Sequence, residues 1–184
     1  WRFHGDPAGP SAPFAPEPPD RSGLPLLLDL RLTRADIVFR TSSGTPLRTE
    51  LTSVTLRAPD ADQPLTLAAA GAYQSVPLTL SGTLGTPSQL RDGRTRFPFP
   101  LRATAPETVL IFEGTSTDPL NADRLEGTLS LQAQSPSAIL TMAGAGPGPA
   151  IPVSLAGAVT RQGDVWRLTG ASGALAGEDF AAPR

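Results

Sequence analysis

Inside runs that alternate apolar and polar residues, the chain repeatedly places a glycine two residues after an apolar residue. The pattern occurs at Leu80-Ser81-Gly82, Phe112-Glu113-Gly114, Leu125-Glu126-Gly127, Leu155-Ala156-Gly157 and Leu168-Thr169-Gly170. Alternation with period two gives a strand one apolar face and one polar face. We therefore expect a sheet whose apolar face combines large side chains with glycines.

Two hairpins show how these residues are expected to meet. A two-residue turn at Gln74-Ser75 pairs Gly71 with Leu78, Ala69 with Leu80, Leu67 with Gly82 and Leu65 with Leu84. A second hairpin, centred on Gln162-Gly163, pairs Val159 with Trp166, Gly157 with Leu168 and Leu155 with Gly170. Both place small residues opposite large ones on one apolar face, which predicts a curved sheet with a continuous, concave hydrophobic face.

The spacing of the strands predicts an elongated, curved antiparallel meander, because no crossover helices fit between them. A shift in apolar parity near Leu51 indicates a bulge. The sequence predicts at most one short helix, over 137–142, with Ser135 as N-cap and Pro136 at the first helical position. We expect loops over 85–93 and 115–123 and a weak last strand over 174–180.

Composition sets the wider limits. The length of 184 residues suits one domain, and the net charge of -2 gives no indication of a nucleic-acid partner. Residues 1–23 are rich in proline and are expected to be a weakly ordered linker or loop, followed by a β domain over 24–184. No cysteine is present, and no apolar run approaches the roughly 18 residues that span a bilayer. The chain starts at Trp1, so we interpret it as a fragment of a longer protein.

No residues combine into a catalytic, metal or cofactor site, so we expect no enzyme and no cofactor. His4 is the only histidine and lies in the proline-rich segment, and the carboxylates are scattered over turns and polar strand faces. The glycine-rich stretch 144–148 contains Pro147 and lacks a following lysine, unlike a phosphate-binding loop. Trp166 has two interpretations, ordinary core packing or the wall of an apolar groove.

Several segments together resemble the AsmA family of Gram-negative bacteria, the AsmA/TamB-like periplasmic repeating β-groove proteins. The resemblance covers roughly residues 24–180. It is carried, in order, by 24–26 and 34–40, 67–82, 112–114, 125–127, 152–157 and 166–173. The final repeat of the family commonly ends in a Gly-Ser-Asp-like turn, and the equivalent stretch here, Gly173-Ala174-Leu175-Ala176-Gly177-Glu178-Asp179, departs from that pattern.

The resemblance implies a groove with an apolar interior that extends into the periplasm from an inner-membrane anchor outside this chain. Such proteins are linked to phospholipid transport and outer-membrane biogenesis, so the expected partners are phospholipid acyl chains and an envelope protein. The candidate groove residues are those of shared parity on the apolar face: Leu65, Leu67, Leu78, Leu80, Leu129, Leu131, Val153, Leu155, Trp166 and Leu168.

A second hypothesis belongs to another class of function. The domain can serve as a structural or assembly module that binds a partner protein through a sheet edge or through its apolar face. The apolar face can also be covered by the sheet curling over itself, which would make it an ordinary core. An anchor helix and further repeats in the parent sequence favour a conduit, whereas a lone secreted domain favours the binding module.

Overall fold

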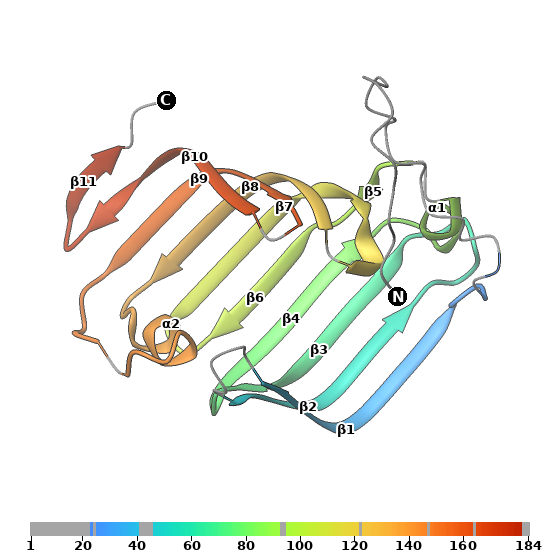
Figure 1. Ribbon diagram of the computed structural model, residues 1–184, viewed down its shortest axis with the longest axis horizontal. Helices are drawn as coiled ribbons and strands as arrows, with labels where there is room; N and C mark the ends of the chain where they lie inside the picture. Colours follow the sequence, from blue (N-terminus) through green and yellow to red (C-terminus); the bar gives the residue numbers. More distant parts are fainter. Residues whose placement is uncertain are drawn as a thin grey trace, which may run out of the picture.

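A computed structural model describes residues 23, 25–40, 46–92, 95–121, 123–146, 148–163 and 165–181, with backbone alone for 37–40, 46–48 and 121. Apart from Gly23, the predicted linker over 1–23 lies outside these residues. The described chain forms one open antiparallel sheet with two short helices (Figure 1). The predicted fold class is therefore confirmed, but the limit of one short helix is wrong.

The strands follow one another across the sheet in chain order (Figure 1). The one departure is the short β5, which pairs with β7 beside β6. The strands are β1 Asp29–Arg40, β2 Pro46–Arg57, β3 Leu65–Tyr73, β4 Val76–Leu84, β5 Phe97–Pro98, β6 Leu101–Ala105, β7 Thr108–Asp118, β8 Asp123–Ala133, β9 Val153–Gln162, β10 Val165–Leu175 and β11 Glu178–Ala181. The helices are α1 Pro87–Asp92 and α2 Ser137–Met142, with a 3₁₀ turn over Pro119–Asn121.

Helix α1 lies where the sequence predicted a loop. Its start is a capping box, in which Thr86 Oγ1 accepts a hydrogen bond from the Gln89 N–H at 3.1 Å and Gln89 Oε1 accepts one from the Thr86 N–H at 2.9 Å. Helix α2 was predicted from Ser135-Pro136, with Ser135 as N-cap. Ser135 Oγ does accept the Ser137 N–H at 3.2 Å, but the N-cap residue is Pro136 and the helix begins at Ser137. Thr86-Pro87 is the same signal, so α1 was equally visible in the sequence.

The register of the first hairpin is as predicted in all four pairs, and the bulge near Leu51 is confirmed. The register of the second hairpin was wrong. Val159 pairs with Leu168, because the strands turn between Gln162 and Val165 rather than around Gln162-Gly163. A further irregularity after Thr169 brings Gly173, and not Gly170, opposite Leu155. The predicted faces survive as far as Thr169, because a shift of two residues returns each side chain to the same side. Beyond the irregularity the shift is three residues, so Gly173 faces inward where Gly170 was predicted to do so.

Two boundaries also differ from expectation. Strand β7 continues through the predicted loop to Asp118. The predicted last strand over 174–180 is divided, because β10 ends at Leu175 and β11 begins at Glu178. Ala176 and Gly177, which connect the two strands, both have positive φ. The connection is therefore a tight turn, which the alternation alone does not reveal.

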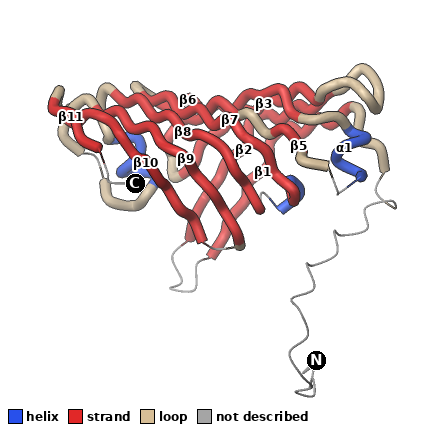
Figure 2. Tube along the Cα trace, turned by 90° about the horizontal axis from the view of Figure 1, so that it is seen from above, coloured by secondary structure: helices blue, strands red, loops and turns tan. Residues whose placement is uncertain are grey.

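The sheet is strongly bent, and its two ends bend to the same side. Figure 2 shows β1–β2 and β9–β10 descending from the central strands toward the side on which α1 and α2 lie. A Cβ on Gly71 would lie 2.1 Å from Glu50 O, and one on Gly114 would lie 2.4 Å from Glu126 O. Glycine is required at these positions, because the backbone of the neighbouring strand occupies the space of a side chain.

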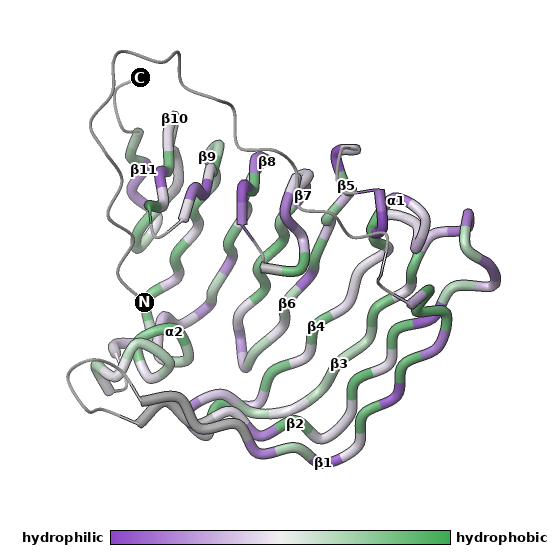
Figure 3. The backbone as a smooth tube through the Cα atoms, turned by 45° about the vertical axis from the view of Figure 1, so that its right-hand side comes forward, coloured by the Kyte–Doolittle hydropathy of each residue, from purple (hydrophilic) through white to green (hydrophobic). Residues whose placement is uncertain are grey.

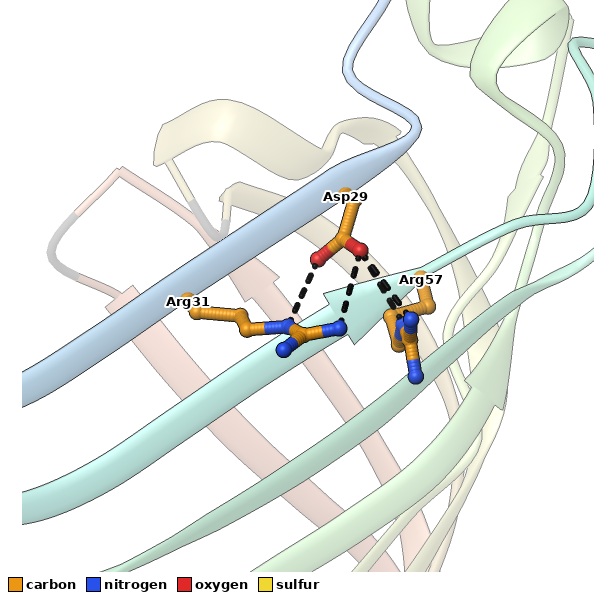
Figure 4. Close-up of polar contacts among 3 residues, drawn as sticks. All are labelled: Asp29, Arg31 and Arg57. Atoms are coloured by element: carbon orange, nitrogen blue, oxygen red, sulfur yellow. Dashed lines mark hydrogen bonds and ion pairs between the residues drawn. The ribbon is translucent and has the colours of Figure 1, made fainter.

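The two faces of the sheet differ in polarity, as the alternating colours along the strands show (Figure 3). The face with Leu67, Leu80 and Leu155 is called the inner face, and the opposite one the outer face. On the outer face of β1–β2, Asp29 pairs with Arg31 and Arg57, both at 3.2 Å (Figure 4). Desolvation raises the pKa of Asp29, but the hydrogen bonds and charges of both arginines together hold that pKa below its ordinary value.

Among the described residues, the buried core forms three clusters, and Phe99 and Leu101 pack against both the first and the third. At one end of the strands, Leu90 of α1 packs on Leu65, Leu84 and Phe97. At the opposite end, Ala138 and Met142 of α2 pack with Val76 and Ala105. A third cluster joins Phe112, Leu125 and Val159. Each helix therefore covers the inner face near one end of the strands, and in the described part of the chain no helix lies over the middle of the strands.

Candidate functional site

A continuous row of apolar residues crosses the inner face between the two helices. Each residue is paired with the next through the strand registers, from β1 to β11 without a break. We call it the central row; it consists of Leu32, Val54, Ala69, Leu80, Ala103, Leu110, Leu131, Leu155, Gly173 and Phe180. Its ten residues make nine steps of about 4.8 Å between strands, or roughly 43 Å in all.

The central row is not sealed inside the protein. Leu32 is 38% exposed and Phe180 is 43% exposed, and the eight residues between them are half-buried. None of the row belongs to the buried hydrophobic core. A half-exposed apolar surface of this length is a candidate binding surface.

A shallow hollow accompanies the row over β2, β3 and β4. Its volume is about 100 Å³, and Leu51, Ala69, Gly71, Leu78 and Leu80 contribute to its lining. Gly71 and Ala69 are small, so the larger side chains beside them stand as walls. The hollow is therefore a product of the small-against-large pairs of the first hairpin.

All ten residues predicted for the groove lie on the inner face, as the registers require. Leu80, Leu131 and Leu155 belong to the central row, and Leu67, Leu78, Leu129 and Val153 are half-buried beside it. Leu65 differs, because it is 1% exposed under α1 and belongs to the core. Trp166 is 57% exposed, so its interpretation as ordinary core packing is wrong.

Sequence reasoning missed part of the row. It did not include Leu32, Val54, Ala69, Ala103, Leu110, Gly173 or Phe180 among the groove residues. The alternation of apolar and polar residues within each strand indicates that these side chains lie on the apolar face. Only the pairing of strands from different hairpins shows that they form one row.

A larger cavity, of about 540 Å³, lies at the ends of β7, β8 and β9. Much of its lining, including Thr115, Glu126 and Thr160, belongs to the outer face. Arg96 pairs with Glu126 at 3.0 Å across it, and both side chains are more than 60% exposed. An exposed ion pair of this kind is a solvated surface feature, so volume alone does not make this cavity the functional site.

The described residues contain no group of three or more His, Cys, Asp or Glu side chains placed to hold a metal ion. Within the same residues, Thr108 Oγ1 is the one buried side-chain polar atom without a hydrogen-bond partner. What the inner face can do chemically is remove apolar surface from water.

None of the helices in the described part of the chain has the length and apolar character needed to cross a bilayer. Comparisons with protein-family models, with curated proteins and with solved structures each found no match.

Proposed function

We propose that this chain is a non-catalytic segment of a periplasmic, membrane-tethered β-groove that conducts phospholipids during transport or outer-membrane biogenesis. The observation that carries the proposal is the central row: a continuous, half-exposed apolar track that the two helices leave open. Its length of roughly 43 Å exceeds the roughly 30 Å thickness of the bilayer hydrocarbon core. An acyl chain therefore finds apolar contact along its whole length.

The mechanism is physical rather than chemical. Each CH₂ group that leaves water for the inner face gains roughly 0.8 kcal/mol. The row carries no charged or hydrogen-bonding side chain from Leu32 to Phe180. Successive positions along the row therefore hold an acyl chain with similar strength, so that the chain can slide from one strand to the next.

The resemblance to the AsmA family supports the same proposal from the sequence side. The curved antiparallel sheet with an apolar inner face is the architecture that the resemblance implies. The periplasmic location and the anchor outside this chain follow from that family and belong to the proposal.

A photo-crosslinking residue at position 80, in the full-length protein and in cells, tests the proposal. Leu80 lies on the central row, and Ser81 next to it lies on the outer face, so the same residue at position 81 is the matched control. We expect phospholipid adducts from position 80 and none from position 81. The absence of any adduct at position 80, together with unfolding of Leu80→Arg, would show a closed core and end the proposal.

The alternative is a module that binds a partner protein, and one observation favours it. Among the described residues β1 pairs with β2 alone, so one edge of this 12-residue strand carries unpaired backbone groups. Such an edge is a template for strand addition. Protein adducts without lipid adducts at position 80, or protein adducts from outward-facing positions of β1, would favour this alternative.

A further inference from the structure

The inner face of β9 changes character at its end. Val153, Leu155, Gly157 and Val159 follow one another along the strand, and the next inward residue is Arg161. Arg161 pairs with Trp166 of β10, and its guanidinium carbon lies 5.1 Å from the centre of the indole ring. A cation over an aromatic face is a favourable arrangement. The apolar surface thus ends in a positive charge stacked on an exposed aromatic ring.

The arginine is held in place by the hairpin itself. Arg161 Nε–H donates to Gly163 O at 3.0 Å, and the Gly163 N–H donates to Asp123 Oδ1 at 2.7 Å. A hydrogen bond from the Arg124 backbone is the main cause that lowers the pKa of Asp123, and desolvation opposes it. The hydrogen bond from the Gly163 backbone and the positive charges of Arg161 and Arg124 lower the pKa further. Asp118 lies opposite Asp123 in the register of β7 and β8, so two carboxylates and two arginines meet here, while Arg96 and Glu126 nearby compensate each other.

We propose that Arg161 and Trp166 form a headgroup site that holds the phosphodiester of a phospholipid whose acyl chain lies on the inner face. This inference rests on the proposed function and adds the ligand's polar end to it. A guanidinium is well suited to phosphate, because its charge and planar donors match the phosphate oxygens. An exposed Trp next to an apolar surface suits the boundary between acyl chain and headgroup, since its ring is apolar at one end and polar at the other.

The distances along the strand fit such a ligand. Six residues separate Arg161 from Leu155 on the central row, which corresponds to about 20 Å of strand. Half of a bilayer core of roughly 30 Å is about 15 Å. An acyl chain of about 15 Å that starts at Arg161 therefore covers most of the roughly 20 Å of β9 up to the central row. The lipid is held at one end of the strand and lies on apolar surface for the rest of its length.

The test compares binding of three probes to the full chain, with Trp1→Phe so that Trp166 is the only fluorescent tryptophan. The probes are dihexanoyl phosphatidylglycerol, dihexanoylglycerol, which lacks the phosphate, and inorganic phosphate. We expect the phospholipid to bind about tenfold more tightly than the diacylglycerol, as one charge-assisted hydrogen-bonded contact provides. Inorganic phosphate alone should bind much more weakly than the phospholipid.

The variants are Arg161→Gln and, as the matched control, Arg167→Gln. Arg167 lies one residue from Trp166 on the outer face, where it pairs with Thr160. We expect Arg161→Gln to remove the tenfold preference and Arg167→Gln to keep it. Arg161→Lys retains the positive charge and should keep part of the preference, which separates loss of charge from loss of folding.

The outcomes distinguish this inference from the proposed function. Equal binding of phospholipid and diacylglycerol, or equal effects of Arg161→Gln and Arg167→Gln, would overturn the headgroup site and leave the apolar groove intact. Inorganic phosphate binding as tightly as the phospholipid would also overturn it, because the site would then be an anion site without a lipid. Failure of both lipids to bind would overturn the proposed function as well.

Discussion

The hairpins β3–β4 and β9–β10 have the same alternating pattern and the same kind of small-against-large pairs, yet they lie in different surroundings. β3–β4 lies between β2 and β6, and α1 and α2 cover its two ends. Among the described residues, the side of β10 that faces away from β9 has a neighbouring strand only over residues 172–175, where β10 pairs with β11. Leu65 and Val76 of the first hairpin are 1% and 7% exposed, whereas Trp166 and Leu168 of the second are 57% and 40% exposed.

The difference shows which property the period-two pattern determines. Alternation fixes the face on which a side chain lies, and the neighbouring elements decide whether that face is buried. The first hairpin therefore supplies stability at its ends, and the second leaves its inner residues free to contact a ligand. The predictions below test this division of roles.

The largest effect is expected from truncating one inner-face leucine of each hairpin, a buried one in the first and an exposed one in the second. Leu65→Ala removes a buried side chain packed against Leu84 and Phe97, so it should lower the free energy of unfolding by about 2–5 kcal/mol. Leu168→Ala removes an exposed side chain and should cost less than about 1 kcal/mol. Urea denaturation of both variants measures the difference. Equal losses would show that the second hairpin is also part of the core.

The next effect separates the glycines of the two hairpins. A Cβ on Gly71 meets backbone at 2.1 Å, at Glu50 O, whereas a Cβ on Gly157 meets Leu168 Cδ1 first, at 2.9 Å, and backbone only at 3.1 Å, at Thr169 O. Backbone cannot yield, but the end of an exposed leucine can rotate away. Gly71→Ala should therefore destabilise the domain by about 1–3 kcal/mol, and Gly157→Ala by less than about 1 kcal/mol. A larger loss for Gly157→Ala in thermal unfolding would contradict this account of the bend.

The two hairpins also show how far the sequence reaches. The faces and the register of β3–β4 followed from alternation and a two-residue turn, because both are local. The register of β9–β10 failed because two turn positions, around Gln162-Gly163 and one step later, satisfy the same alternation. Helix α1 was missed although Thr86-Pro87 carries its signal. The central row is beyond local reasoning, since it depends on how strands of different hairpins pair.

The turns of the two hairpins provide a smaller contrast. Gln74 and Ser75 have φ values of 50° and 66°, a region that glycine adopts more readily, and Gly163 has a φ of 58°. Ser75→Gly should stabilise the domain by about 0.5–1 kcal/mol, because it relieves left-handed strain at some cost in entropy. Gly163→Ala should destabilise by about 1 kcal/mol, since its Cβ meets no neighbouring atom and backbone strain alone acts. Thermal midpoints that move in the same direction for both variants would contradict this.

The smallest effect is a pH dependence that the turn of the second hairpin has and the turn of the first does not. Asp123 accepts the Gly163 N–H at 2.7 Å, and the hydrogen bond from the Arg124 backbone is the main cause that holds the pKa of Asp123 below its ordinary value of 3.8. A carboxyl whose pKa is lower in the folded state stabilises that state above the unfolded pKa, and the contribution is lost as the pH falls through the folded pKa. The turn should therefore be tight above about pH 4 and should loosen in more acidic solution. The Gly163 amide proton in NMR spectra should report this change with a midpoint below 3.8, and the amide of Ser75 should not. Asp123→Asn keeps an oxygen acceptor without the charge, so it should abolish the titration at Gly163; a midpoint at Gly163 that persists in this variant would assign the pH dependence to another group.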